Sequence, residues 1–139
     1  MWTRNCHKKC FGDKMKEVTK SYLAGFFDGE GCISITKNKK RNHYNLVVTV
    51  SGTKPKIISM FEQFFGGNVR IKLKNFPRQQ VWIWNVYGEE RREFLQIINP
   101  YLILKKEEAL LGLKYSMYLH KYGLQDIREE FRLQMSSLK

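Results

Sequence analysis

Hydrophobic positions in the first half of the chain recur with two different periods. Between residues 17 and 28 the apolar side chains lie three and four positions apart, which predicts an amphipathic helix that Gly29 and Gly31 end. Two runs of alternation between apolar and polar residues follow, one around Ile33 and one around Val48, with a polar turn between them. Such alternation is typical of paired β-strands that turn one face to the core.

The second half of the chain shows the same succession of helix and strands. Pro55 suits the first turn of a helix, and Gly66 and Gly67 stop the apolar run that follows it. In residues 69–74, Val, Ile and Leu alternate with Arg and Lys, so we expect a strand with an apolar inner face and a cation at every outer position. The other expected elements are a strand over 81–87 and helices over 89–98, 104–120 and 124–138.

The order αββαββα predicts an α+β domain with one four-stranded antiparallel sheet and helices on one face. We assign residues 17–139 to this single domain and residues 1–16 to a basic N-terminal arm. The open sheet face then carries polar and cationic side chains, namely Ser34, Thr36, Asn38, Asn45, Thr49, Arg70, Lys72 and Lys74. Such a face suits the major groove of DNA, where side chains read base edges. The alternative is an ordinary solvated face, which the lack of acidic residues disfavours.

The positive charge of the chain is unevenly distributed. The formal net charge is +12, and between Gly31 and Gly88 ten Lys and Arg stand against a single acid, Glu62. From Glu89 onward, nine basic and eight acidic residues nearly balance. A solvated surface usually mixes both signs, so the one-sign segment indicates a surface for a polyanion. A basic protein without a nucleic-acid partner remains the alternative, because charge alone does not fix function.

The three cysteines, Cys6, Cys10 and Cys32, are odd in number and irregularly spaced, which argues for a reducing compartment rather than a disulfide framework. Cys6, His7 and Cys10 resemble half of a zinc site, but a second ligand pair is missing from the sequence. No apolar stretch approaches the roughly 20 residues that a membrane span needs. We therefore expect no membrane partner.

The string LAGFFDGEG over Leu23–Gly31 combines small, apolar and acidic residues. Gly25 and Gly29 are four positions apart and share one helix face, which allows a second helix to approach closely. If that helix belongs to a second copy, each helix end delivers one Glu30 near the two-fold axis. Two neighbouring carboxylates repel each other unless cations bridge them, and Mg²⁺ suits carboxylate oxygens. A solvated turn containing the two acids is the alternative.

This string, followed by Cys32–Ile35, resembles the motif of the LAGLIDADG homing endonucleases, single-motif type, and the resemblance extends over Thr19–Leu119. It implies a saddle-shaped sheet and an intron-encoded, homodimeric enzyme that hydrolyses phosphodiester bonds on both strands of a long DNA site. Glu30 would be the metal ligand, with the carbonyl of Gly29 as a second ligand and Asp28 as a structural acid. The implied cofactor is Mg²⁺, with Mn²⁺ as a substitute. The implied location is an organelle (chloroplast or mitochondrion) or the cytoplasm of a prokaryotic or phage host.

The resemblance also implies a catalytic lysine. Relatives carry one after the apolar run that closes the third helix, and Lys105 stands at this point, with Lys106 as its rival. Its ammonium would stabilise phosphate charge or help to activate water. A surface lysine at the start of a helix is the alternative.

One position departs from the family pattern. After the second strand, relatives often carry a polar residue and, four positions later, a basic one, and these positions are Gly52 and Lys56 here. Glycine has no side chain, so water would have to be positioned by Ser51, Thr53 or the backbone. Lys56 keeps a possible contact to phosphate, with an exposed lysine in the first turn of a helix as the alternative.

We expect DNA contacts from the open sheet face and its turns, that is, from Ser34, Thr36, Asn38, Lys40, Asn45, Thr49, Arg70, Lys72, Lys74, Arg78 and Gln80. One rival interpretation is a catalytically silent DNA- or RNA-binding protein on the same fold, such as a regulator or a splicing maturase. Retention of Glu30 favours the enzyme, because a pure binder has no use for an acid at the two-fold axis. The other rival is a general RNA-binding module, which would need aromatic residues on the open face. We place Trp82 and Trp84 in the core instead.

Overall fold

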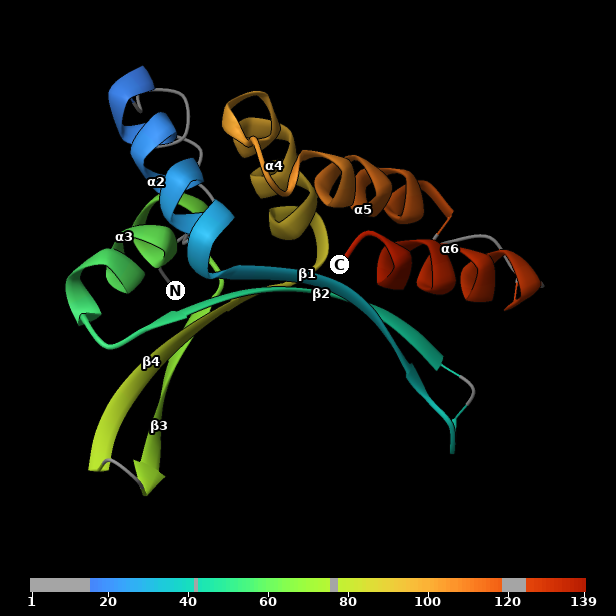
Figure 1. The fold of residues 1–139 in the computed structure, drawn as a ribbon, viewed down its shortest axis with the longest axis horizontal. Helices are drawn as coiled ribbons and strands as arrows, with labels where there is room; N and C mark the ends of the chain where they lie inside the picture. The colour runs from blue at the N-terminus through green and yellow to red at the C-terminus, as the bar shows by residue number, and fades with distance from the viewer. Residues whose placement is uncertain (1–15, 42, 76–77, 119–124) are drawn as a thin grey trace, which may run out of the picture.

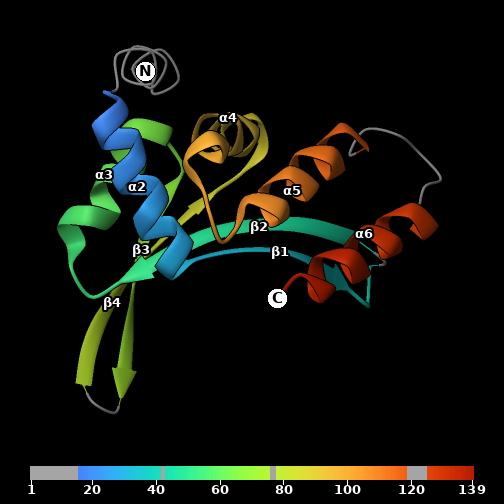
Figure 2. The same ribbon diagram turned by 45° about the horizontal axis from the view of Figure 1, so that its top comes forward.

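Four antiparallel strands form one curved sheet, and the helices of the described residues lie on its convex side (Figures 1 and 2). The structure is a computed structural model and describes residues 16–41, 43–75, 78–118 and 125–139. The proposed arm, Lys16 excepted, and the Cys6–His7–Cys10 group lie outside these residues. The elements are α2 (Glu17–Glu30), β1 (Gly31–Asn38), β2 (His43–Gly52), α3 (Pro55–Phe65), β3 (Asn68–Asn75), β4 (Arg78–Val86), α4 (Gly88–Ile98), the 3₁₀ turn η1 (Asn99–Tyr101), α5 (Lys106–Tyr118) and α6 (Gln125–Ser137).

This order confirms the predicted αββαββα core, followed by a further helix, α6. The strands are hydrogen-bonded in the order β1-β2-β4-β3, so β1 and β3 form the two edges. Two helix boundaries differ from the prediction by two residues each. Helix α2 continues through Gly29 to Glu30 and is capped at Gly31, and α5 begins at Lys106 rather than at residue 104.

Helix α3 ends where the sequence predicts, at two glycines with left-handed backbone. Gly66 and Gly67 have φ angles of +79° and +77°, which L-residues with a side chain rarely adopt. A Cβ atom at Gly67 would also lie 2.3 Å from the carbonyl oxygen of Asn85. The double glycine therefore both stops α3 and lets the chain return tightly into β3.

An aromatic cluster fills the core between the sheet and helices α3 and α4. Trp84 on β4 is fully buried, and its ring centroid lies 5.2 Å from that of Phe61 and 4.9 Å from that of Phe94. Its indole N–H donates to the carbonyl oxygen of Gly66 at 2.7 Å, so the buried polar atom is satisfied. The prediction that Trp84 is a core residue is confirmed, and Trp82 is half-buried against the same cluster.

The apolar half of β3 is not buried as its alternation predicts. Ile71 and Leu73 are 58% and 60% exposed, and only Val69 is half-buried. The far part of the β3–β4 hairpin extends beyond the helix layer (Figure 1). Ile71 and Leu73 do lie opposite the cations of β3, as the alternation predicts, but they stay exposed because a strand buries a face only where another element covers it.

No helix in the described ranges is long and apolar enough to cross a membrane.

Candidate functional site

The concave face of the sheet carries the polar side chains that the sequence assigned to it. Cross-strand partners point to the same face of a sheet, and neighbours along a strand point to opposite faces. The pairs Thr36↔Asn45, Thr49↔Asn85 and Asn68↔Asn85 connect all four strands on one face. By this register the concave face holds all eight predicted residues, namely Ser34, Thr36, Asn38, Asn45, Thr49, Arg70, Lys72 and Lys74.

Three of these residues already have local hydrogen bonds, among them Thr36, whose hydroxyl donates to the carbonyl oxygen of Asn45 at 3.4 Å. The side-chain oxygen of Asn38 accepts from the backbone N–H groups of Lys40 and Arg41, at 3.1 and 3.4 Å, and so orders the β1–β2 turn. The hydroxyl of Thr49 donates to the carbonyl oxygen of Trp84 at 2.8 Å. Lys40 lies exposed in the same turn. DNA contacts from Asn38 and Thr49 would therefore compete with bonds inside the sheet.

Arg78 and Gln80 do not share the concave face. They pair with Asn75 and Leu73, so both lie on the opposite side of the hairpin. Gln79 pairs with Lys74 and lies on the concave face in their place. The sequence analysis named Gln80 for the open face and missed Gln79, although the alternation of the strand decides between the two residues. Counting back in steps of two from the buried Trp84 would have put Gln80 on the helix side.

Asp28 joins the end of α2 to the segment before α5. Its Oδ2 accepts from the backbone N–H groups of Ile103 and Leu104 at 2.7 and 3.1 Å, and its Oδ1 accepts from that of Lys105 at 3.0 Å. The ammonium of Lys105 in turn donates to the backbone carbonyl of Asp28 at 2.7 Å. The buried carboxylate thus caps local backbone, as predicted, and fixes Lys105 beside the end of α2.

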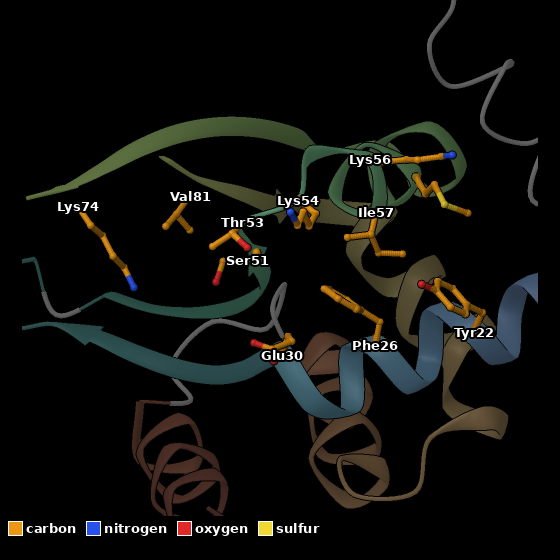
Figure 3. Close-up of a pocket in the computed structure, with 12 residues that line it drawn as sticks. Tyr22, Phe26, Glu30, Ser51, Thr53, Lys54, Lys56, Ile57, Lys74 and Val81 are labelled. Carbon is orange, nitrogen blue, oxygen red and sulfur yellow. The ribbon is translucent and has the colours of Figure 1, made fainter. Parts of the chain in front are cut away.

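Glu30, the last residue of α2, is exposed and borders a cavity of about 730 Å³ (Figure 3). The cavity lies between α2 and the β2–α3 junction, where Ser51, Thr53, Lys54 and Lys56 line it. In Figure 3 the ammonium of Lys56 points away from the Glu30 side. Lys54, which the sequence analysis did not single out, is therefore a second candidate for the cation of this cavity.

The cavity wall also explains what is lost at Gly52. A Cβ atom there would lie 3.4 Å from the Cδ1 of Ile58 and 3.5 Å from the Cζ of Phe26, which is ordinary contact. A larger residue could therefore place its Cβ atom at position 52, but its side chain would begin in contact with the apolar groups of Ile58 and Phe26.

An open stripe of apolar and small residues runs along α2 toward Glu30. Val18 and Tyr22 are 78% and 61% exposed. A Cβ atom built at Gly25 or at Gly29 would meet no atom within 4 Å. The two glycines share one helix face, as predicted, and no residue in the described ranges covers them.

The model of the family described as LAGLIDADG endonuclease matches residues 23–119. The chain belongs to this family. The match begins with Leu23 in α2 and ends before α6, so the last helix lies beyond the residues that the family model matches. Among curated protein sequences, none matches this LAGLIDADG chain significantly.

Solved structures share its fold. The homing endonuclease I-CvuI, in complex with the I-CreI target, is 24% identical, with 88% of this chain and 83% of that chain covered and a TM-score of 0.68. An archaeal intron-encoded homing endonuclease complexed with DNA is 18% identical, with 88% and 85% covered and a TM-score of 0.70. The group I intron-encoded homing endonuclease I-CeuI, complexed with DNA, is 15% identical, with 88% and 68% covered and a TM-score of 0.67.

The metal-ligating groups of the LAGLIDADG chain form only part of a site. Among the residues that the structure describes, no three His, Cys, Asp or Glu side chains gather closely enough to hold a metal ion. Mg²⁺, however, commonly binds through one or two carboxylates and completes its shell with water and substrate phosphate. The exposed carboxylate of Glu30 and the neighbouring carbonyl of Gly29 are hard oxygen donors, so they fit as the protein's share of such a site.

Proposed function

We propose that this protein is a site-specific DNA endonuclease that acts as a homodimer with a divalent metal ion. The observation that carries the proposal is the position of Glu30. Its exposed carboxylate ends the motif helix, next to the open glycine stripe, and borders a cavity that Lys54 and Lys56 also line. The carboxylate of Glu30 and the open face of α2 therefore lie beside a cavity with lysines in its wall.

The stripe on α2 supports the homodimer. An apolar helix face with two glycines, which the described part of the chain leaves uncovered, is suited to pack against a copy of itself across a two-fold axis. Since Glu30 follows Gly29 directly, dimerisation through the stripe would bring the two Glu30 carboxylates near the axis. One chain with a single motif then yields two sites, one for each DNA strand.

Glu30 and the carbonyl of Gly29 would hold Mg²⁺, or Mn²⁺ in its place. When bound, the ion would stabilise the charge of the reacting phosphate. Lys105, whose ammonium donates to the carbonyl oxygen of Asp28, would keep a positive charge beside the metal ligands. Lys54 or Lys56 would bind phosphate, and the hydroxyls of Ser51 and Thr53 would orient water in place of the side chain missing at Gly52.

The concave face would bind the DNA. Among the described residues, the polar side chains of this face include hydroxyls, amides and cations, and none is a carboxylate. The homing endonucleases named above share the fold and were solved in complex with DNA. Serine, threonine and asparagine can read base edges, while Arg70, Lys72 and Lys74 can bind guanine or phosphate. Arg78 and Gln80 lie on the other side of the hairpin, so they would contact the DNA only where its sugar–phosphate backbone wraps around the tip of the hairpin.

The test is cleavage of a randomised duplex library with Mg²⁺, followed by sequencing of the cut molecules. We expect a single long, pseudo-palindromic site. The matched control is Glu30→Gln, purified identically, which keeps the shape of the side chain but loses the charge that holds the metal. This variant should bind the selected site with Ca²⁺ and cut it below detection.

Two outcomes would contradict the proposal. If the wild-type protein binds one site selectively but leaves it intact with Mg²⁺ and with Mn²⁺, the protein is a binder and not a nuclease. If Glu30→Gln cuts at the wild-type rate, the metal assignment is wrong.

A further inference from the structure

A second cavity, of about 700 Å³, lies at the edge of the sheet between β1 and α6. Its lining residues are Ile35, Thr36, Lys37, Lys39, Glu129 and Arg132. Figures 1 and 2 show α6 beside the outer half of β1, away from the β3–β4 hairpin. The helix α6 lies beyond the residues that the family model matches, so this cavity is built in part outside that match.

A hydrogen-bonded network holds one cation in the cavity. The hydroxyl of Tyr44 donates to Oε2 of Glu129 at 2.6 Å, and Nε of Arg132 donates to both oxygens of that carboxylate at 3.1 Å. The hydrogen bonds from Arg132 and then from Tyr44 lower the pKa of Glu129 to about 2. Glu129 therefore stays ionised at neutral pH and anchors Arg132 through a fixed fork.

The cavity has an excess of positive charge. Lys37, Lys39 and Arg132 stand against the single carboxylate of Glu129, which leaves a net charge of +2. A guanidinium has five N–H donors, and the hydrogen bonds described to Glu129 engage only Nε and Nη2. The Nη1 donors lie outside these bonds. An arginine held by a carboxylate on one side and flanked by lysines is suited to bind phosphate.

The place of the cavity in the fold indicates which phosphate this is. β1 is an edge strand, with Thr36 on the concave face and Lys37 on the other, so the cavity curves around that edge. When a sheet lies in the major groove, the sugar–phosphate backbones run along its edges. Lys37 stands seven residues beyond Glu30 along an extended strand, which is roughly 20 Å, or about six base pairs of B-DNA.

We propose that α6 and the outer half of β1 form a phosphate-binding site that clamps the DNA backbone at the outer flank of each half-site. The proposal rests on the proposed function, because it requires DNA on the concave face. It assigns α6 the role of lengthening the DNA footprint without reading further bases.

The test compares two duplexes, both containing the selected site. One has long flanks, and the other is trimmed to remove the outermost base pairs of each half-site. Binding is measured with Ca²⁺ over a series of salt concentrations, for the wild-type protein, for Lys37→Ala/Lys39→Ala and for Arg132→Ala. The matched control is Lys114→Ala, because Lys114 is exposed on α5 and lines a different groove.

On the long duplex both variants should bind more weakly than the wild type, and the slope of log K against log salt should fall by about 0.9 for each phosphate that the variant no longer neutralises. On the trimmed duplex the difference should disappear, since the DNA no longer offers that phosphate to the wild type either. Lys114→Ala should match the wild type on both. Arg132→Lys keeps the positive charge but loses the forked hydrogen bonds to Glu129. Thermal melting of this variant checks that α6 stays packed against the sheet without them.

The proposed phosphate-binding site would be contradicted if the variants bind the long duplex as tightly as the wild type. It would also be contradicted if they lose equal affinity on both duplexes. Wild-type cleavage of the trimmed duplex tests the proposed function by itself. A failed clamp with intact cleavage therefore leaves the endonuclease proposal standing.

Discussion

The two faces of helix α2 differ in what they contact. On one face Leu23 and Phe27 are fully buried, and Asp28 bonds to the backbone before α5. On the other face Tyr22 is 61% exposed, and a Cβ atom at Gly25 would meet no atom within 4 Å. One fourteen-residue helix therefore has a face that stabilises the single chain and a face that none of the described residues covers.

This difference implies that folding and activity can be changed separately, even by neighbouring residues. Substitutions on the buried face should lower the free energy of unfolding of the protomer. Substitutions on the open face, and at Glu30 where it ends, should alter assembly or cleavage while the protomer stays folded.

The largest contrast is expected between Glu30→Gln and Asp28→Asn. Glu30→Gln should abolish cleavage with the free energy of unfolding changed by less than about 0.5 kcal/mol, because the side chain is exposed. Asp28→Asn should leave one of the backbone N–H donors of Ile103, Leu104 or Lys105 without an acceptor, at a cost of about 1–3 kcal/mol. At temperatures where it is folded, Asp28→Asn should still cut.

Denaturant unfolding and plasmid cleavage of the same two preparations check this contrast. Equal losses of stability in both variants would show that the end of α2 is one structural unit and would remove the distinction between its faces.

How far the sequence predicted α2 shows where pattern alone is insufficient. The spacing of its apolar residues correctly predicts a helix, but the helix has two apolar stripes, one with Val18 and Tyr22 and one with Leu23 and Phe27. Only the second is buried in the chain. Which stripe faces the core depends on the position of the sheet and of α4, and local periodicity contains no information about either.

The same limit applies to the sites. The motif residues around Glu30 are contiguous and were found by resemblance, and the alternation in β3 correctly grouped its cations on one face. The network of Tyr44 and Glu129 joins residues 85 positions apart and could not be predicted from spacing. Exposure of Ile71 was missed for a similar reason, because it depends on where the helix layer ends.

The next largest effect is expected on β3, where the two faces can be compared within one strand. Replacing Arg70, Lys72 and Lys74 together by Ala should weaken DNA binding and flatten its salt dependence by up to about 0.9 for each phosphate left without its cation. The matched control replaces Ile71 and Leu73 by Thr, since both lie on the opposite face of the strand and are also exposed.

Fluorescence anisotropy with the selected duplex, from low to moderate salt, measures both variants. The control should keep the wild-type slope. A triple variant with an unchanged slope would mean that the concave side of β3 does not touch the backbone.

The smallest expected effect is the most specific for the open face of α2, because its sign differs between the single chain and the dimer. Alanine at Gly25 removes a helix-weakening glycine, and since its Cβ meets no atom within the chain, the protomer should gain about 0.5–1 kcal/mol. If the stripe packs closely against its copy, the same methyl group must separate the two helices, so the dimer should dissociate more readily. Sedimentation equilibrium measures the dimer constant, and denaturant unfolding at high dilution measures the protomer, with Gln96→Ala, exposed on α4, as the control. A protomer that is stabilised while the dimer constant is unchanged would mean that the two-fold contact lies elsewhere. Glu30 would then not be brought to the axis by this helix face.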